Sequence, residues 1–567
     1  MTPDQITAAD DARYLALKAR DARFDGCFFT GVTSTGIYCR PVCSVKAPKR
    51  ENCRFFSLAA QAESAGFRPC LRCRPELAPH SVVWSIQDAS YILAHQAARL
   101  LDEPENWAPT LVASRAFGGA LPLAQDNGAL RLRPGKAGSA APAGEERSPG
   151  VISGLASRLG ISDRHVRRIF EAQFGVSPVQ YLQTRRLLTA KQLLADTQLP
   201  ITQIALISGF ASVRRFNAAF VEHYHLNPTQ LRRQGAPVAG QGILVRLGYR
   251  PPYDVAAMLE YFIAHPLPGV EFVNVQATSP VLRRTLRIEA SGKIHTGWLS
   301  ATFDTGSSQL LLEVSDSLRE VLPIVIRRVR ATFDLDADPQ AINNALRSSF
   351  PHGDGLRVPG ALDGHELAIR AVLGQQVTVQ AGCRQAQRLV ERFGESIATP
   401  WPDLTRLFPT PAALAAASSD DLGALGIIRQ RQAAITGIAR AVLEKKLQLH
   451  GGAPVQATIA TLKALPGIGD WTAQYIAMRA LRWPDAFPAG DVALHKAMGL
   501  KGAKNPARLA EAASLRWQPW RSYAVIRAWS GAAKAQSVKR GRGAPTDGPT
   551  KAETGRPGGI GVIGAML

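Results

Sequence analysis

Apolar residues recur at helical spacing through the second quarter of the chain. The segment ISGLASRLGISDRHVRRIFEAQFG predicts two helices, with a turn at Gly160 and an N-cap at Ser162. A similar pair follows in ITQIALISGFASVRRFNAAFVEHYHLNP, with a turn at Gly209 and an N-cap at Ser212. A helix over residues 178–196 is expected to join them. The pattern predicts a duplicated helix-turn-helix, which can place two helices in successive major grooves.

The hydrophobic pattern changes after the linker GAPVAGQG. The segments ILVRLGYRPPYDVAAMLEYF and RTLRIEASGKIHTGWLSATFD contain alternating apolar and polar residues, as half-buried strands do. Residues 359–533 are helical in pattern, and a further helix is expected over residues 83–101. Residues 102–148 are rich in Gly, Pro and Ala and predict a flexible insert. The end of the chain, rich in Gly, Lys, Arg and Pro, predicts a disordered basic tail.

The composition fits several packed domains with a basic surface. The chain has 567 residues, 46% of them hydrophobic, which excludes wholesale disorder. No run approaches the roughly 18–20 apolar residues of a membrane helix. The first residues, MTPDQITAADDARY, are acidic and polar, unlike a signal peptide. The formal net charge of +22 favours a polyanionic partner, and nucleic acid is the default candidate.

Six of the seven cysteines lie within the first 73 residues. Two close pairs stand out, Cys39-x3-Cys43 and Cys70-x2-Cys73. Each pair puts two thiolates on one turn, and two such turns can form a tetrahedral Zn²⁺ site. On spacing alone, a purely structural zinc knuckle is the favoured interpretation.

The residues around these cysteines resemble a known family. The segments TGIYCRPVC and GFRPCLRC are similar to the N-terminal zinc domain of the bacterial adaptive-response regulator Ada, over roughly residues 10–77. The resemblance implies that Cys39 accepts a methyl group from a DNA methylphosphotriester and that Cys43, Cys70 and Cys73 complete the zinc site. A zinc-bound thiol is held as the nucleophilic thiolate, and its methylation would weaken repulsion from DNA phosphates. Basic residues expected to give the phosphate positive surroundings are Arg40, Lys46, Lys49, Arg50, Arg68 and Arg72.

The two helix-turn-helix units together resemble the AraC-type DNA-binding domain, which also follows the zinc domain in Ada. The stretch SGFASVRRFNAAFVEHYHLNPTQLR carries the match. Arginine and asparagine can read base edges or reach only phosphates, and each arginine fits a solvated helix face equally well. The candidate DNA-binding residues are Arg164, Arg167 and Arg168 on the first reading helix and Arg214, Arg215 and Asn217 on the second.

A sharper motif lies in LKALPGIGDWTAQYIAMRAL, where LPGIG between two helices is the helix-hairpin-helix signature. Gly467 and Gly469 let the backbone approach DNA, and the next helix offers free N–H groups to a phosphate. A hairpin alone indicates only sequence-independent DNA binding. Asp491 follows in FPAGDVALHKAM, where it fits an N-cap for a helix beginning at Val492.

This half of the chain resembles the AlkA-type 3-methyladenine DNA glycosylases, over about residues 243–530. The match rests on LGYRPPYDVAAML, LRVPGALDGHELAIRAVLGQQVTV, WQPWRSYAVIRAW and the hairpin. The resemblance implies that Asp491 stabilises an oxocarbenium-like sugar and orients water, with no cofactor. It also implies an aromatic pocket for cationic alkylated purines, although core packing is the commoner role of a single tryptophan. The pocket candidates are Trp471, Tyr475, Trp529 and Tyr261.

Three positions bear on the reaction and its substrate range, and two of them, Gln376 and Val492, differ from the family pattern. Bifunctional members carry a lysine where this chain has Trp471, so we expect hydrolysis without strand cleavage. Gln376 stands where an apolar wedge is common, and it can fill the gap by hydrogen bonding to the orphaned base. Val492 replaces the aromatic residue of the best-known member, which bears on substrate range. The Pro-Cys-His-Arg element of the alkylguanine-transferring domain of Ada is absent from the sequence.

The expected fold class is multidomain α+β, with a small four-cysteine zinc domain, an all-α double helix-turn-helix domain and a strand-rich subdomain plus an α-helical helix-hairpin-helix domain. The expected boundaries are 1–80 for the zinc methyl-acceptor domain, 81–234 for the helix-turn-helix domain with its insert near 102–148, 235–242 for a linker, 243–355 for the strand-rich subdomain, 356–533 for the glycosylase domain and 534–567 for the tail.

We predict that the chain excises alkylated purines such as 3-methyladenine and, through Cys39 on one Zn²⁺, accepts methyl groups in a single turnover to regulate repair genes. One alternative is a repair enzyme whose front half only localises it to DNA. The other is a sequence-specific regulator whose glycosylase half is only a DNA-binding module. The expected partners are double-stranded DNA, damaged and promoter, and RNA polymerase. We expect no membrane association, a monomer, and a cytoplasmic, nucleoid-associated location in a bacterium.

Overall fold

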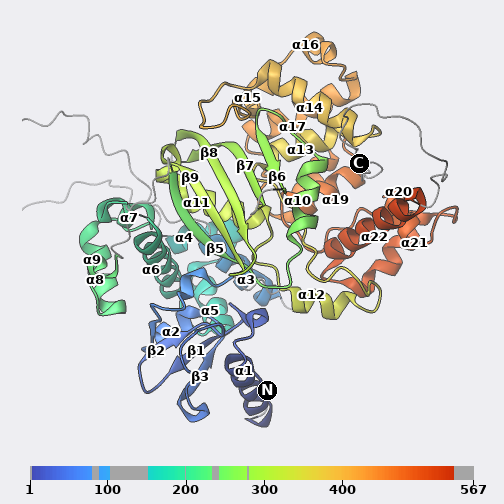
Figure 1. Ribbon diagram of the computed structural model, residues 1–567. Coiled ribbons are helices and arrows are strands. Elements are labelled where there is room, and N and C mark those ends of the chain that lie inside the picture. Colours follow the sequence, from blue (N-terminus) through green and yellow to red (C-terminus); the bar gives the residue numbers. More distant parts are fainter. Residues whose placement is uncertain are drawn as a thin grey trace, which may run out of the picture.

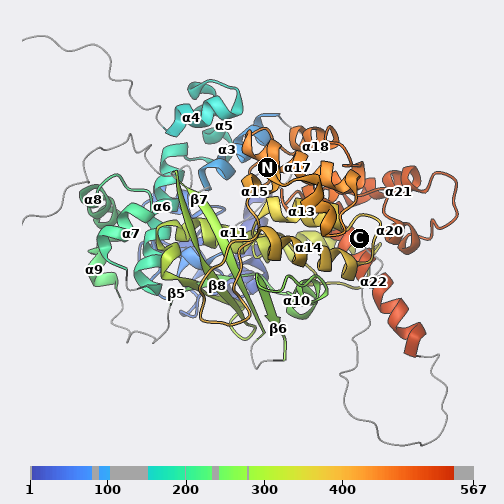
Figure 2. The ribbon, with the colours of Figure 1, turned by 90° about the horizontal axis from the view of Figure 1, so that it is seen from above.

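The computed structural model shows four packed regions along the chain (Figures 1 and 2). It describes residues 3–79, 89–102, 151–197, 199–232, 242–276, 280–290 and 292–541. The predicted insert from residue 103 onward, most of the predicted linker and the last part of the predicted tail lie outside these ranges. In the part of the chain that is described, no helix has the length and apolar character needed to cross a membrane.

The N-terminal region is a small sheet with strand order β3-β1-β2-β4, flanked by short helices (Figure 1). Buried Phe29, Tyr38 and Phe67 form its core. β2 pairs antiparallel with β1 and parallel with β4, so the two cysteine-bearing turns that follow β2 and β4 lie side by side. The elements are α1 (Pro3–Lys18), β1 (Phe29–Val32), β2 (Ile37–Cys39), β3 (Cys53–Phe56), α2 (Ala59–Ser64) and β4 (Arg68–Pro69), with 3-10 turns at Ala22–Phe24, Arg50–Asn52 and Pro75–Leu77.

The second region is all-helical and matches the predicted duplicated helix-turn-helix. Ser162 and Ser212 cap the two reading helices by accepting the third backbone N–H of each. Gly160 and Gly209 occupy the turns with φ of +68° and +84°, a conformation that favours glycine. The helices are α3 (Ala89–Asp102), α4 (Val151–Leu159), α5 (Asp163–Phe174), α6 (Pro178–Asp196), α7 (Ile201–Ile207), α8 (Val213–Tyr224) and α9 (Pro228–Leu231).

Helices α6 and α3 were both predicted from the sequence. The joining helix α6 has the limits that the sequence predicts. The helix expected over 83–101 is present from Ala89, and residues 83–88 lie outside the described ranges.

The third region is a five-stranded antiparallel sheet with strand order β5-β9-β8-β7-β6 (Figure 1). Alternate residues of β5 are buried, as the alternating pattern predicts, and β9 shows the same burial. The second segment with the alternating pattern forms β7 and β8, which are buried over consecutive residues. Helices α7, α8 and α11 share one apolar core with this sheet, so the second helix-turn-helix is not a separately packed unit. The elements are β5 (Gly242–Gly248), α10 (Val255–Ala264), β6 (Glu271–Asn274), β7 (Val281–Ala290), β8 (Lys293–Asp304), β9 (Gln309–Ser315), a 3-10 turn (Asp316–Val321) and α11 (Leu322–Thr332).

The fourth region is a helical layer with its own large apolar core. In Figure 2 its helices run from yellow and gold, at α13 and α14, to orange and red. Its helices are α12 (Pro339–Leu346), α13 (Gly364–Leu373), α14 (Val379–Phe393), α15 (Pro411–Ala416), α16 (Ser419–Ala424), α17 (Arg429–Leu443), α18 (Val455–Lys463), α19 (Asp470–Arg479), α20 (Val492–Ala497), α21 (Pro506–Ser514) and α22 (Arg521–Gly541), with a 3-10 turn at Leu515–Trp517.

One prediction for this region needs correction. Helix α12 precedes the predicted boundary at 355, although its Ile342 and Leu346 pack into the helical core. The tail was expected to be disordered from residue 534, but α22 continues to Gly541. The sequence AAKAQSVKR after position 531 consists largely of good helix formers, so nothing ends the helix there.

Buried charges join the N-terminal region to the helix-turn-helix. Lys191 on α6 is 2% exposed and pairs with the carboxylate of Glu76, while its ammonium also donates to the carbonyl of Cys70 at 3.2 Å. Arg74 forms a bidentate pair with Asp196 at 2.7 and 2.8 Å. Breaking a buried pair leaves an uncompensated charge, so these contacts fix the two regions relative to each other.

Arg250 joins the N-terminal region to the second half of the chain. Its side chain is fully buried, and its guanidinium donates to the carbonyls of Asp25 and Pro79 on one side. On the other side it donates to the carbonyls of Asp336 and Ala337, at 2.9 and 3.0 Å. One cation thus satisfies carbonyl groups from segments more than 250 residues apart.

Candidate functional sites

The four predicted zinc ligands come together at one end of the small sheet. Cys39 ends β2, Cys43 lies on the turn after it, and Cys70 and Cys73 follow β4. Their sulfur atoms all lie within 4.8 Å of one another. In a tetrahedral site with Zn–S bonds of about 2.3 Å, the sulfur atoms are roughly 3.8 Å apart. Donor type and spacing therefore fit Zn²⁺.

Hydrogen bonds among the four thiols set their pKa values in opposite directions. The bond with Cys39 lowers the pKa of Cys43 to about 7 and also lowers the pKa of Cys70, whereas the pKa of Cys39, which is hydrogen-bonded to Cys43, and that of Cys73 are raised. The backbone N–H of Arg40 donates to the sulfur of Cys73 at 3.3 Å. Cys43 and Cys70 are buried, whereas Cys39 and Cys73 are half-buried and thus more accessible to an incoming group.

Arg40 was expected to give a DNA phosphate positive surroundings, and this expectation is wrong. Its side chain is buried and pairs with Asp25, and it donates to the carbonyl of Cys73 at 2.9 Å. The guanidinium of Arg40 donates to both carboxylate oxygens of Asp25 inside the protein, and it is the only counter-ion of Asp25 among the described contacts. It is therefore not available to a DNA phosphate. Lys46, Lys49 and Arg72 do lie exposed on the surface.

All six candidate DNA-binding residues of the reading helices are exposed: Arg164, Arg167 and Arg168 on α5 and Arg214, Arg215 and Asn217 on α8. The apolar faces of both helices are buried, with Phe170 and Phe216 fully enclosed. At its far end α8 is anchored to the N-terminal region. There His223 contacts the carboxylate of Glu63 at 2.8 Å, and Glu63 also accepts from Tyr38 and Thr184.

The hairpin joins α18 to α19 as predicted. Gly467 has a φ of +82°, and a Cβ there would meet the carbonyl oxygen of Gln430 at 3.1 Å, so glycine is required. Gly469 precedes the first residue of α19, and a Cβ on it would meet nothing within 4 Å. No contact among the described residues explains Gly469, so its outer face is free for a partner.

Gln376 lies on the turn after α13, close in sequence to a residue that fixes the hairpin. Its side chain is exposed and its φ is +53°, a strained conformation for a non-glycine residue. The neighbouring Gln375 donates to the carbonyl of Gly467 at 2.9 Å and to the hydroxyl of Thr472 at 3.0 Å. The turn that carries Gln376 is thus held against the hairpin.

Asp491 is a buried carboxylate that accepts hydrogen bonds from three N–H groups. It is 5% exposed and caps α20, because Oδ1 accepts the backbone N–H of Leu494 at 2.6 Å. The indole N–H groups of Trp471 and Trp529 donate to Oδ2 and Oδ1 at 2.9 and 3.0 Å. The N-cap interpretation is therefore correct, but two tryptophans from other helices also converge on the same carboxylate.

The four predicted pocket residues form one cluster beside this carboxylate. The rings of Trp471 and Tyr475 stack with centroids 5.1 Å apart and planes 12° apart. The hydroxyls of Tyr261 and Tyr475 lie 3.3 Å apart, and Trp529 joins through its bond to Asp491. These residues come from α10, α19 and α22, and α10 precedes the other two helices by more than 200 positions.

One member of the cluster was missed by sequence reasoning. The Arg479 guanidinium lies 4.1 Å from the ring centroid of Tyr261, 4.9 Å from that of Tyr475 and 6.0 Å from that of Trp529. The available signal was its spacing, since positions 471, 475 and 479 share one face of a helix.

A small cavity of about 30 Å³ adjoins the aromatic cluster. It is lined by Tyr261 and Tyr475 of the cluster and by His265, Arg370 and Cys383, among others. Burial lowers the pKa of His265 to about 3, so this ring is neutral.

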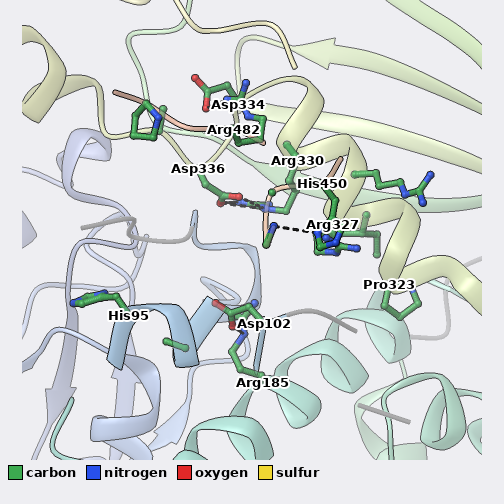
Figure 3. A pocket seen from close by; sticks show the side chains of 18 of the residues that line it. His95, Asp102, Arg185, Pro323, Arg327, Arg330, Asp334, Asp336, His450 and Arg482 are labelled. Carbon is green, nitrogen blue, oxygen red and sulfur yellow. Dashed lines mark hydrogen bonds and ion pairs between the residues drawn. The ribbon is translucent and has the colours of Figure 1, made fainter. Parts of the chain in front are cut away.

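The other cavity, of about 990 Å³, lies between the two halves of the chain. In Figure 3, Asp102 and Arg185 stand on one side of it and Arg330, Asp334 and Asp336 on the other. Neither Asp491 nor any of the four clustered cysteines lines this cavity, so it is separate from both candidate sites.

Comparison with protein-family models identifies four domains in the order that the structure shows. Residues 12–76 match the metal binding domain of Ada, and residues 155–234 match a helix-turn-helix domain. Residues 244–363 match the AlkA N-terminal domain. Residues 369–521 match the HhH-GPD superfamily base excision DNA repair protein.

A similar arrangement occurs in a curated protein of Mycobacterium tuberculosis, named "Probable bifunctional transcriptional activator/DNA repair enzyme AlkA". It is 35% identical over 529 residues, which span 91% of this chain and 95% of that protein. This chain belongs to the same bifunctional family.

Two other relatives each match one half of this bifunctional chain. The DNA-3-methyladenine glycosylase 2 of Escherichia coli is 33% identical over 283 residues, 50% of this chain and 95% of that protein. The bifunctional transcriptional activator/DNA repair enzyme Ada of Escherichia coli is 28% identical over 230 residues. That match covers 41% of this chain but only 51% of Ada, in line with the missing Pro-Cys-His-Arg element.

Proposed function

We propose that this chain repairs alkylated DNA by two separate reactions. The second half hydrolyses the N-glycosidic bond of alkylated purines such as 3-methyladenine. The first half accepts methyl groups from DNA methylphosphotriesters and directs transcription of repair genes. The observation that carries the glycosylase proposal is the convergence of two indole N–H groups and one backbone N–H on the Asp491 carboxylate.

Asp491 acts on the sugar in this proposal. As the bond from C1′ to the base nitrogen breaks, positive charge develops on the sugar, and the carboxylate stabilises it electrostatically. The three N–H donors fix both carboxylate oxygens, so little reorganisation is needed during the reaction. The base leaves with the electron pair of the C1′–N bond, so that a cationic alkylated purine departs as a neutral molecule. Water then adds to C1′ and gives up a proton to solvent.

The aromatic cluster receives the extruded base by stacking. Gln376, exposed on a strained turn beside the hairpin, fills the vacated space in the duplex. The hairpin offers Gly467, Gly469 and the first N–H groups of α19 to the backbone phosphates.

We further propose that excision proceeds without strand cleavage. A lyase reaction needs an amine that attacks the sugar, and Trp471 stands at the position where bifunctional relatives carry a lysine. The indole N–H of Trp471 donates to Asp491. Lys463, at the end of the helix that precedes the hairpin, has an amine, but this amine pairs with Asp470 at 2.8 Å.

In the first half, we propose that one Zn²⁺ is bound by Cys39, Cys43, Cys70 and Cys73. Bound zinc keeps the thiols deprotonated at neutral pH. The half-buried Cys39 attacks the methyl carbon of the phosphotriester: an S–C bond forms, the O–C bond breaks, and the phosphodiester is released. Cys39 of each protein molecule reacts only once, because the thioether that it forms is stable.

The exposed residues of α5 and α8 bind promoter DNA in this account. The anchoring of α8 to the zinc-binding region, through His223 and Glu63, gives a physical link between the methyl acceptor and the second reading helix. RNA polymerase is the expected protein partner, and the chain acts as a monomer.

A glycosylase assay on methylated duplex DNA tests the central part of the proposal. Base release and strand nicking are recorded separately for the unaltered protein and for Asp491→Asn. Release without nicking, with a loss of about 10²–10³-fold in the variant, is expected. Asparagine is itself a good N-cap, so α20 should remain folded. Excision that survives in the variant contradicts the role of Asp491, and nicking by the unaltered protein contradicts the monofunctional proposal.

A further inference from the structure

Arg479 is a buried cation that the glycosylase reaction, as proposed above, does not use. Its side chain is 3% exposed, and Nη1 donates to the carbonyl of Pro359 at 2.8 Å. Its Nε is buried and has no hydrogen-bond partner in the described structure. No carboxylate of the described residues forms an ion pair with it. Burying a charge with so few hydrogen-bond partners costs free energy of folding, unless other neighbouring groups stabilise the charge.

Those surroundings are the rings of the base pocket. Trp471, Tyr475 and Arg479 follow one another at intervals of four along α19, which places Tyr475 in the middle of a column. Trp471 stacks on one side of Tyr475, and the Arg479 guanidinium lies 4.9 Å from the Tyr475 centroid. The same guanidinium lies over Tyr261 at 4.1 Å. One fixed cation therefore engages the π-electrons of two pocket rings and approaches a third, that of Trp529.

We propose that Arg479 is a specificity-determining residue that sets the preference of the pocket between cationic and neutral damaged bases. The inference rests on the proposed glycosylase function. Aromatic rings attract a cationic base through their electron-rich faces. A guanidinium that already draws on those faces weakens this attraction and, within a low-dielectric pocket, repels a second positive charge. A neutral base, which depends on stacking alone, is affected much less.

The Arg479 guanidinium places one positive charge beside the pocket rings. Selection of cationic lesions must then come from their weaker glycosidic bonds rather than from a charge preference of the pocket. The residue acts on the base through Tyr475 and Tyr261 and is not itself a catalytic residue.

The test measures kcat/KM for base release from two duplexes, one with 7-methylguanine, which is cationic, and one with hypoxanthine, which is neutral. Two variants remove the charge, Arg479→Gln and the bulkier Arg479→Met, and Arg479→Lys keeps it. We expect the ratio of the 7-methylguanine to the hypoxanthine rate to rise about fivefold or more in Gln and Met, and to stay within about twofold in Lys.

A matched control is Arg357→Gln. Arg357 is also buried and lies 5.0 Å from the ring centroid of Tyr253, but it donates to the carbonyls of Arg250 and Pro252, outside the pocket. Its loss should lower both rates in parallel, as a structural role does. A parallel fall or an unchanged ratio in the charge-removing variants of Arg479 overturns the inference. Failure of the unaltered protein to release either base overturns the proposed function itself, which is a separate outcome.

Discussion

The four-cysteine cluster and the Asp491 site are assembled in opposite ways. All four cysteines lie between residues 39 and 73, on two turns of one small sheet whose strands pair directly. The residues around Asp491 come from α10, α19 and α22 and span positions 261 to 529. Local backbone structure brings the cysteines together, whereas the second site needs the packing of the helical core, which holds Trp471, Tyr475 and Trp529, and of the sheet core, which holds Tyr261.

The two sites should therefore fail in different ways. A zinc site loses its geometry when one ligand is lost, since the remaining turns have little core to hold them. The Asp491 site is supported by a core whose first member is Leu267 and which contains no residue of the N-terminal region. Damage to the zinc site should thus leave base excision largely intact.

The largest expected effect is that of Cys70→Ser. Cys70 is buried in the cluster and its carbonyl accepts from Lys191, so its replacement should remove both the zinc ligand and the packing around it. We expect bound zinc and methyl transfer to fall to background, whereas kcat/KM for base release changes by less than about threefold. Zinc is measured by metal analysis, methyl transfer with labelled methylphosphotriester DNA, and base release with methylated duplex.

Cys383→Ser is the matched control. This cysteine lies on α14, away from the cluster, and its replacement should leave zinc content and methyl transfer unchanged. If Cys70→Ser abolished base release as well, the two regions would not be separable in the way described.

The same contrast explains how much of the molecule the sequence could predict. The spacing of Cys39, Cys43, Cys70 and Cys73 was sufficient to predict their cluster, and Ser162 and Ser212 marked the starts of the two reading helices. These features are local. The burial of Arg40 against Asp25 could not be foreseen, because it depends on a contact between loops that no periodic pattern encodes.

The second site was reached only through family resemblance. Asp491 by itself fits an ordinary N-cap, which it also is. The indole N–H bonds that distinguish it arise from α19 and α22, so no single segment contains the information. Arg479 shares a helix face with Trp471 and Tyr475, but its position against Tyr261 follows from tertiary packing.

An intermediate effect is expected from removing one indole donor at a time. Trp471→Phe and Trp529→Phe each keep an aromatic ring but lose an N–H that donates to Asp491. A hydrogen bond to a charged group contributes about 1.5–3 kcal/mol, so we expect each variant to lower kcat for base release by about 10- to 150-fold.

Trp401→Phe serves as the control for these variants. Trp401 packs against Trp298 and Arg283, far from Asp491 in its contacts, and its replacement should leave kcat within about twofold. Wild-type rates in both indole variants would show that the N–H donors do not position the carboxylate.

The smallest effect concerns the contact between α8 and the zinc-binding region. Burial alone would lower the pKa of His223, but the hydrogen bond and ion pair with Glu63 outweigh it and raise the pKa above the ordinary value of 6.5. The stabilisation is therefore fully present below about pH 6.5 and is lost as the pH rises through the raised pKa.

We expect the melting temperature of the unaltered protein to fall relative to that of His223→Gln as the pH rises from 6 to 8. Glutamine keeps a donor for Glu63 but does not titrate, so the variant lacks this part of the pH dependence. Thermal unfolding followed by circular dichroism at several pH values measures the difference. Parallel curves for the two proteins would show that this pair does not contribute.

The central claim is that one chain carries two reactions at two independent sites, and a crossed experiment tests it most directly. Methyl transfer and base release are measured on the same preparations of the unaltered protein, Cys39→Ser and Asp491→Asn. We predict that Cys39→Ser loses methyl transfer and keeps base release, and that Asp491→Asn loses base release by about 10²–10³-fold and keeps methyl transfer. Loss of both activities in either folded variant would contradict the claim.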